Sequence, residues 1–311
     1  MKRLPLLLNI YVHYKGNYMN NKPLVIGIGE LLWDIMPTGR HPGGAPANFV
    51  YHAAAGGCEA YAISAVGKDN FGKELLAELA SHGLDTSYIA ELNDYATGTV
   101  TVSLKNGIPD YIIHENTAWD HIPFTTKNAE LAKQADAVCF GSLAQRSPDS
   151  ASTIQAFLAN AHPDCLIVFD VNLRQNFFSK KIIERSLELA DILKINDEEL
   201  PRVCGMLGIS GDQRAMLQGL CDNFNLKAVA LTLGSDGSLY HSISGREIHS
   251  PCIDFGPVAD TVGCGDSFTG ALIAALLHGK SDEEAWTIAN KTAGFVASRH
   301  GAMPVYDMGI Y

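Results

Sequence analysis

The chain has 311 residues, which is enough for one large α/β domain with an insertion. Hydrophobic residues make up 47% and charged residues 18%, as in ordinary globular proteins, and the formal net charge of −11 excludes a general attraction to nucleic acid or to an anionic membrane. An anionic substrate must therefore be held by local groups, such as backbone amides, a metal ion or a few cationic side chains.

The cysteines and the first residues bear on the compartment. The seven cysteines form no Cys-x-x-Cys pair, which favours reduced thiols in a cytoplasmic protein and gives no zinc motif. Residues 1–8 resemble the start of a signal peptide, but the apolar run ends at Asn9 and no small-residue cleavage site follows. We therefore expect residues 1–22 to be an extension outside the fold, with a targeting segment as the alternative. No later stretch reaches the roughly 18 uninterrupted apolar residues of a membrane helix.

The first part of the chain predicts alternating strands and helices. An apolar run at residues 24–29 predicts a buried strand. A helix is expected over residues 46–55, with Pro46 in its first turn, where the missing N–H costs nothing. A strand over residues 60–66 and an amphipathic helix over residues 69–81 follow.

The next segment has a different pattern. Residues 98–105 alternate between apolar and polar, Asn106 and Gly107 follow, and residues 111–113 return to an apolar run. Asn-Gly between two β-rich runs predicts a hairpin. A hairpin of this kind inside an α/β chain indicates a protruding flap rather than a part of the main sheet.

The remainder resumes the strand and helix alternation. Strands are expected at residues 137–140, 166–170, 191–195 and 228–233, followed by a small hairpin around residues 239–249 and helices at 267–278 and 282–298. Repeated strand–helix units predict an α/β fold with a mainly parallel central sheet and helices on both faces. We find no internal repeat or linker, so one domain with a flap is expected.

A glycine-rich string carries the first sign of chemistry. Residues 260–268 read Asp-Thr-Val-Gly-Cys-Gly-Asp-Ser-Phe and lead straight into a predicted helix. The N–H groups and the positive dipole end of a helix start form an anion site. Asp266 can accept a proton from an attacking hydroxyl, and the amides of Gly263, Cys264 and Gly265 can stabilise charge on a moving phosphoryl group. Glycines and acids are also common at helix starts, so the motif alone does not decide the function.

The whole nine-residue string resembles the nucleotide-side signature of the ribokinase-like (PfkB) carbohydrate kinases. Residues 43–50, which run on to Gly56 and Gly57, resemble the sugar-side signature of the same family. The resemblance covers the chain from about Leu24, and residues 43–48 and 115–120 are most similar to fructokinases. It implies a ribokinase-like domain over residues 23–311. Cys264 departs from the family's commoner alanine, but activity should survive because the backbone N–H does the work, although the thiol makes the enzyme a target for thiol reagents.

The resemblance also implies a sugar site. It assigns Asp34, Gly43, Gly44, Asn48 and Asp266 to the sugar, and it places Arg174 near both the sugar and the transferred phosphate. Arg174 follows a buried strand, which is a favoured place for a ligand in an open α/β sheet, although a surface arginine is the plainer interpretation. Asn48 supplies both a donor and acceptors, although a glycine turn before a helix would account for the same string.

The nucleotide side rests on weaker signals. The loop with Thr232, Gly234 and Gly237 resembles the family's ATP-contacting loop, and Asn290 falls in the region that lines the adenine pocket. Asn196 and Glu199 match the element that orders Mg²⁺ and the phosphates largely through water, and they equally form a capping box. Asp260, with the carbonyl of Val262, corresponds to a monovalent-cation site in some relatives, but the sequence gives no independent sign of K⁺.

Two other nucleotide motifs fail on spacing. In the string that starts at Gly27, Leu32 stands where a dinucleotide fingerprint needs its third glycine. Gly67-Lys68 and Gly279-Lys280 lack the first glycine of a P-loop.

The expected reaction is therefore transfer of the γ-phosphoryl group of MgATP to a primary hydroxyl of a small sugar, with D-fructose as the first candidate. A lid formed by residues 31–40 and 95–118 is expected to close over the sugar and exclude water. Family relatives often pair such lids, so a homodimer is expected. The alternatives are a kinase for 2-keto-3-deoxygluconate, ribose or a nucleoside, and a non-catalytic sugar sensor.

Overall fold

The computed structural model describes residues 22–36, 39–105 and 108–306. The extension predicted over residues 1–22 therefore lies outside the described residues except for Lys22, and so does the predicted Asn106-Gly107 turn.

One large sheet organises the described chain, in the strand order β13-β12-β11-β10-β9-β8-β1-β4-β5. Its strands are β1 (Leu24–Ile28), β4 (Glu59–Gly67), β5 (Ile89–Leu92), β8 (Ala137–Gly141), β9 (Leu166–Asp170), β10 (Ile192–Asn196), β11 (Ala228–Thr232), β12 (Ser238–Ser242) and β13 (Glu247–Ser250). The pairings from β5 to β11 are parallel, and β12 and β13 add antiparallel pairs at one edge. The predicted α/β fold with a mainly parallel sheet is confirmed.

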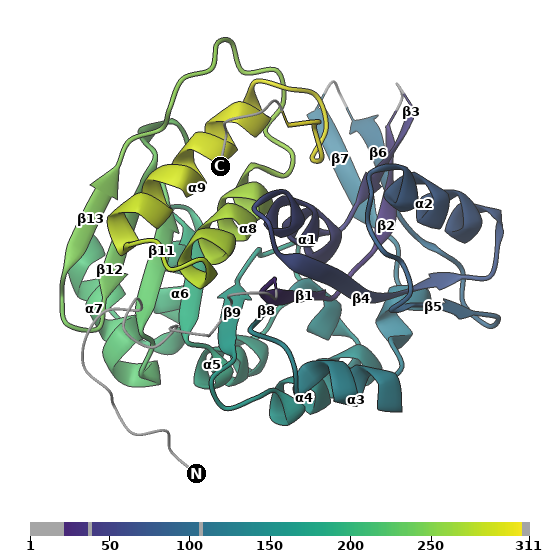
Figure 1. Ribbon diagram of the computed structural model, residues 1–311, viewed down its shortest axis with the longest axis horizontal. Helices are drawn as coiled ribbons and strands as arrows, with labels where there is room; N and C mark the ends of the chain where they lie inside the picture. The colour runs from purple at the N-terminus through teal and green to yellow at the C-terminus, as the bar shows by residue number, and fades with distance from the viewer. Residues whose placement is uncertain (1–21, 37–38, 106–107, 307–311) are drawn as a thin grey trace.

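Helices cover both faces of this sheet (Figure 1). One face carries α1 (Ala45–Ala55), α2 (Asn70–Ser81), α8 (Cys264–Leu277) and α9 (Asp282–Ala297), and the other carries α3 (Thr126–Ala132), α4 (Pro148–Asn160), α5 (Lys180–Leu189), α6 (Glu199–Leu207) and α7 (Gln213–Phe224). Successive side chains of a strand point to opposite faces, so Val25 packs in one apolar cluster while Ile26 and Ile28 pack in the other. The apolar runs seen in the sequence are the consequence of this two-sided burial.

A second, smaller sheet projects from one end of the molecule, at the right of Figure 1. Its strand order is β3-β2-β6-β7, with β2 (Leu32–Met36), β3 (Gly39–Gly43), β6 (Gly98–Lys105) and β7 (Ile108–Ile113). The predicted hairpin is present as the antiparallel pair of β6 and β7, and β2 runs parallel to β6. The sequence predicted a small β lid from about residues 31–40 and 95–118, and β2 and most of the β6–β7 hairpin lie in these ranges. The end of β3 extends beyond residue 40, which was not predicted because Gly-Arg-His-Pro-Gly lacks the apolar alternation that marks a strand.

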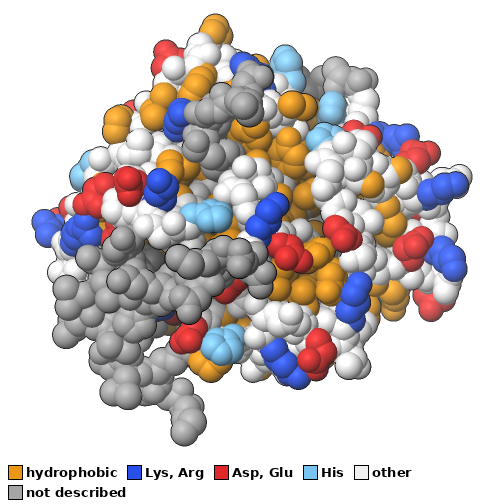
Figure 2. Space-filling view, in the orientation of Figure 1, with side chains coloured by type: hydrophobic (Ala, Val, Ile, Leu, Met, Phe, Trp, Pro, Cys, Tyr) orange, Lys and Arg blue, Asp and Glu red, His pale blue; other side chains and the backbone are white. Residues whose placement is uncertain are grey.

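The described surface is mixed in charge. On the face drawn in Figure 2, acidic and basic side chains are interspersed and do not gather into one patch of a single sign. Among the helices in the described part of the chain, none combines the length and the apolar character that crossing a bilayer requires.

Candidate active site

The predicted anion loop forms the first turn of α8. This helix begins at Cys264, three residues earlier than the sequence predicted, so Gly265 and Asp266 lie inside its first turn. Gly263 precedes it in the left-handed region, with φ of 76°, and a Cβ added there would lie 2.5 Å from the Cβ of Ala302. Only glycine fits this position without strain. The amide of Cys264 donates to Thr261 O at 3.3 Å. The first amides of a helix lack carbonyl partners within the helix, so this start is suited to bind an anion.

The base candidate is held by the neighbouring helix. Asn48, in the second turn of α1, donates from Nδ2 to Oδ2 of Asp266 at 2.7 Å. The two helices approach closely because Gly270 has no side chain, and a Cβ there would lie 2.6 Å from Phe49 O. The predicted sugar-side and nucleotide-side motifs therefore meet at a single hydrogen bond.

The groups around Asp266 shift the pKa of its carboxyl group in opposite directions. Burial raises its pKa above the ordinary aspartate value, while the Asn48 hydrogen bond and the charges of Lys194 and Arg174 oppose that shift. The net result is a raised pKa. A carboxylate with a raised pKa is a stronger base than a free aspartate, as proton transfer from a hydroxyl requires.

The other predicted sugar residues come from the small sheet, from the start of α1 and from the loop after β9. Asp34 lies on β2 opposite His41 of β3, and its Oδ2 rests over Gly43, where a Cβ would lie only 2.3 Å away. Burial raises the pKa of Asp34, and the Arg174 guanidinium opposes this shift as it does for Asp266. Arg174 is exposed, and its charge faces both carboxylates.

Glu30 is a site residue that the sequence analysis did not single out. It lies two residues after the end of β1, is 4% exposed, and its Oε2 has no hydrogen-bond partner among the described residues. Burial raises its pKa, and the nearby Asp266 adds to the shift. A Cβ on Gly44 would lie 2.4 Å from Glu30 O, so this turn packs directly on the predicted sugar motif. An acid just after a buried strand was the available signal.

A buried ion pair is the second feature that was missed. Lys194 Nζ lies 3.2 Å from Oδ1 of Asp170, and the two side chains are 9% and 6% exposed. Burial, with repulsion from Asp266 and Glu199, raises the pKa of Asp170 to about 6 although the Lys194 charge opposes it. A lysine in the otherwise apolar run of β10 was the signal in the sequence.

Asn196 and Glu199 form the reciprocal pair that the sequence predicted. The Glu199 amide donates to Asn196 Oδ1 at 2.8 Å, and the Asn196 amide donates to Glu199 Oε2 at 3.1 Å. Glu199 Oε1 also accepts from the amide of Leu173 at 2.8 Å. Within the described ranges there is no group of three acidic, His or Cys side chains that could cage a metal. Backbone amides hold both carboxylate oxygens of Glu199, which suits a carboxylate that orders Mg²⁺ through water rather than by direct ligation, and this role stays a prediction.

The remaining predicted residues lie around the turn between β11 and β12, in α9 and in the loop before α8. Thr232 ends β11, and Gly234 and Gly237 adopt positive φ in the turn that leads to β12. Asn290 of α9 donates to Ser238 Oγ at 2.8 Å and to Trp286 O at 2.9 Å, so it ties α9 to β12.

The carboxylate of Asp260 is engaged by backbone amides. Its two oxygens accept from the amides of Val262 and Gly301 at 3.0 and 3.2 Å. Binding of K⁺ at Asp260 stays a prediction. The nucleotide contacts expected of Thr232, Gly234, Gly237 and Asn290 stay predictions too.

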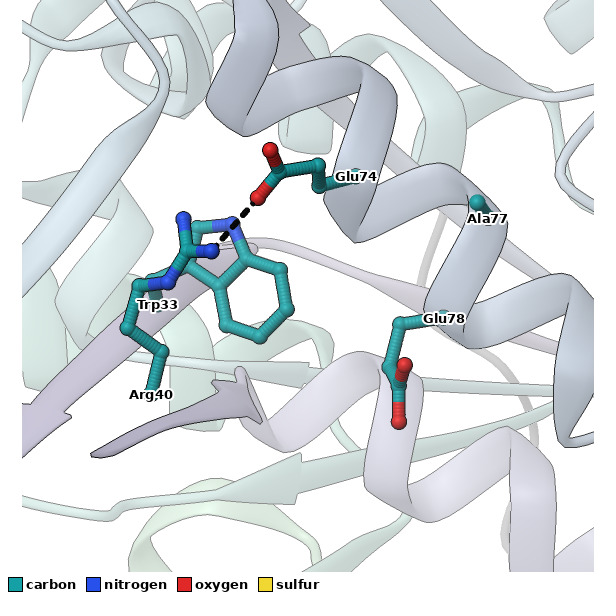
Figure 3. A pocket seen from close by; sticks show the side chains of 5 residues that line it. All are labelled: Trp33, Arg40, Glu74, Ala77 and Glu78. Carbon is teal, nitrogen blue, oxygen red and sulfur yellow. Dashed lines mark ion pairs between the residues drawn. The ribbon is translucent and has the colours of Figure 1, made fainter. Parts of the chain in front are cut away.

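Two pockets differ in their relation to these residues. A small one between α1, α8 and the ends of β8 and β9 contains Asp266 and Asp170. A wider one, of about 520 Å³, lies between the small sheet and α2 and is lined by Trp33, Arg40, Glu74, Ala77 and Glu78 (Figure 3). There Arg40 pairs with Glu74 at 2.6 Å. Trp33 faces α2 and its neighbour Asp34 faces the other way, because side chains alternate along a strand. Among the predicted site residues, Asp266 lines the small pocket, and none of them is among the five that line the wide one.

The chain is similar in sequence and in fold to known proteins. The model of the pfkB family carbohydrate kinases matches residues 29–307. Fructokinase-1 of Oryza sativa subsp. japonica is 28% identical over 309 residues, which cover 90% of this chain and 94% of that protein. A sugar kinase of Pyrococcus horikoshii, described as uncharacterized and solved in complex with ATP, superposes with a TM-score of 0.74 at 28% identity over 90% of this chain and 94% of the other. Aminoimidazole riboside kinase of Salmonella enterica, solved with aminoimidazole riboside and an ATP analog, gives 0.75 at 25% identity over 90% and 95%.

Proposed function

This chain belongs to the pfkB family of carbohydrate kinases, and from that premise we propose that it transfers the γ-phosphoryl group of ATP to a primary hydroxyl of D-fructose. One observation carries the proposal: Asn48 holds the Asp266 carboxylate at 2.7 Å in the first turn of α8, where a proton acceptor and an anion site coincide. The similarity to a rice fructokinase over 90% of the chain supports fructose as the acceptor.

The proposed reaction is an in-line transfer of the γ-phosphoryl group from ATP to the sugar hydroxyl. Asp266 takes the proton of the sugar hydroxyl as its oxygen attacks the γ-phosphorus in line with the bond to ADP. The new O–P bond forms, the bond to the β-phosphate oxygen breaks, and ADP leaves. The amides of Gly263 and Gly265 hold the moving group, and Arg174 screens its charge. Asn196 and Glu199 would hold Mg²⁺ through water, and the bound ion would neutralise phosphate charge.

We assign the small sheet as the lid of this site, within a kinase domain that covers residues 23–311. Asp34 and Gly43 lie on its strands β2 and β3, so a sugar bound to them also contacts the sheet. Binding would thereby couple the sheet to the body and exclude water from the reacting groups. The assignment agrees with the lid expected over residues 31–40 and 95–118. A homodimer of a cytoplasmic enzyme completes the proposal.

The choice of substrate is open to a direct test. The similarity to an aminoimidazole riboside kinase makes a riboside the main rival acceptor, with ribose and 2-keto-3-deoxygluconate next. ADP release should be measured with each sugar, and sugar binding should be followed by calorimetry. We expect the highest kcat/KM with D-fructose. A higher value with another sugar would replace fructose, and fructose binding without ADP release from any sugar would support the sensor.

A further inference from the structure

The last described residues, 301–306, form a strap between the loop before α8 and the helix α1. At its start the amide of Gly301 donates to Asp260 Oδ2 at 3.2 Å. Further along, Pro304 O accepts from the hydroxyl of Tyr51 in α1 at 2.7 Å. We call these residues the C-terminal strap.

The C-terminal strap packs against the anion loop at a buried residue, Ala302. A Cβ added to Gly263 would lie 2.5 Å from Ala302 Cβ and 2.8 Å from its Cα. Gly263 is the residue that turns the chain into α8. The position of Ala302 therefore limits where the first turn of α8 can lie.

His52 of α1 fastens the strap from below. Its side chain is fully buried, with Nε2 at 2.9 Å from Ala302 O and Nδ1 hydrogen-bonded to the Tyr306 hydroxyl. Burial lowers the pKa of His52 to about 4, so the ring is neutral at neutral pH. A carbonyl oxygen can only accept, so Nε2 carries the proton and Nδ1 accepts from Tyr306.

The same face of α1 also holds the base candidate. Asn48 and His52 are four positions apart in the helix and therefore lie one above the other. Asn48 donates to Asp266, and His52 reaches Gly263 through Ala302. One helix thus holds both the carboxylate and the glycine that begins the anion loop.

Packing alone does not call for a histidine at this place. A buried imidazole costs free energy unless its nitrogens are hydrogen-bonded, whereas an apolar side chain of similar size would fill the space without that demand. Both ring nitrogens of His52 bond to the C-terminal strap, so the bonds hold a neighbouring segment in place.

We propose that His52 is a positioning residue for phosphoryl transfer, which holds Ala302 O and thereby keeps the C-terminal strap against Gly263 and the anion loop in its receiving form. The inference rests on the proposed kinase function and extends it to a residue that lines neither pocket.

The test compares two substitutions of similar length, His52→Gln and His52→Met. Only the glutamine amide can replace the donor to Ala302 O. With the preferred sugar, kcat of His52→Met should fall about 10- to 100-fold while the sugar KM stays within about threefold, because a displaced loop loses contacts made in the transition state. His52→Gln should keep kcat within about threefold of wild type.

Hydrogen exchange measures the anion loop without any substrate. In His52→Met the amides of residues 260–268 should exchange about 2- to 10-fold faster than in wild type, as loss of one hydrogen bond predicts, while those of β9 should be unchanged. In His52→Gln both segments should exchange as in wild type.

A second buried histidine supplies the matched control. His241 of β12 is also fully buried, and its ring nitrogens lie 3.0 Å from Glu247 Oε1 and 3.0 Å from Gln218 Oε1. His241→Met should lower the free energy of unfolding but leave kcat and the exchange of residues 260–268 unchanged. A general loss of stability would instead affect the two methionine variants alike.

The outcomes separate this inference from the kinase proposal. Equal losses of kcat in His52→Gln and His52→Met would assign His52 to packing only, and wild-type kcat and exchange in a folded His52→Met would also overturn the inference. If His52→Met does not fold, Tyr306→Phe removes the hydroxyl that bonds Nδ1 and should show the same changes to a smaller degree; unchanged kcat and exchange there would overturn the inference as well.

Turnover that depends on Asp266 would leave the kinase proposal standing in each of these cases. If the wild type phosphorylates no sugar, the proposed function fails. The exchange of residues 260–268 in the His52 variants then still decides whether His52 positions the anion loop.

Discussion

The hydrogen bond from Asn48 to Asp266 makes a quantitative prediction for Asn48→Leu. Leucine has a similar size but no donor, and the Asn48 Oδ1 that it also removes has no partner among the described residues, so folding should persist. A hydrogen bond to a charged group contributes about 1.5–3 kcal/mol. Since one pKa unit corresponds to about 1.4 kcal/mol, losing the donor should raise the pKa of Asp266 by about 1–2 units.

The sign of the effect follows from the role of the base. Asp266 must be ionised to accept a proton, and burial already places its pKa above the ordinary value. Activity is therefore lost as pH falls through this pKa, and Asn48→Leu should move that acid limb to higher pH by about 1–2 units.

The assay is kcat/KM against pH from about 5 to 9, which reports the free enzyme. Loss of a sugar contact by Asn48 would lower kcat/KM equally at every pH, so the position of the limb isolates the effect on Asp266. Tyr51→Phe is the control, because it removes a 2.7 Å hydrogen bond from the same helix to Pro304 O and leaves Asp266 untouched. Coincident acid limbs for wild type and Asn48→Leu would refute the reasoning.

Two further substitutions test the anion loop. Gly263→Ala should lower the free energy of unfolding, measured by urea denaturation, by about 2–4 kcal/mol, because the backbone at Gly263 is left-handed and the new Cβ would press on Ala302. Gly279 is the matched control, because it has the same φ of 76° but nothing within 4 Å of an added Cβ. Gly279→Ala should therefore show only the backbone cost of about 1–2 kcal/mol. Equal losses would show that the contact carries no cost. Cys264→Ala should keep kcat within about twofold, and a maleimide should inactivate the wild type slowly at neutral pH, because burial raises the pKa of the Cys264 thiol to about 12. Rapid inactivation that Cys264→Ala abolishes would contradict this.

The sequence predicted the parts of the molecule whose signals are local. The strand over residues 166–170 matches β9 because an apolar run bounded by polar residues needs no distant information. The string around Asp266 is also local, and its resemblance to a family signature singled it out, although the role of Asp266 as the base stays a prediction. The start of α8 was placed three residues late because glycine disfavours a helix interior, whereas the first turn tolerates it.

The features that were missed depend on distant partners. Asn48 and Asp266 lie 218 positions apart, so no local pattern reveals that one orients the other. Lys194 belongs to the site only because β10 and β9 are neighbours and α8 begins above them. The strand β2 pairs with the edge of β6, and β3 pairs with β2, so both depend on a distant hairpin more than on their own composition.

The central claim is that Asp266 acts as the base for phosphoryl transfer to a sugar, and Asp266→Asn tests it most directly. The variant keeps the size of the side chain and removes the proton acceptor. ADP release with saturating ATP and the preferred sugar should fall by about 10²- to 10⁴-fold, while calorimetry shows sugar and nucleotide still bound. Near-normal turnover by the folded variant would contradict the account.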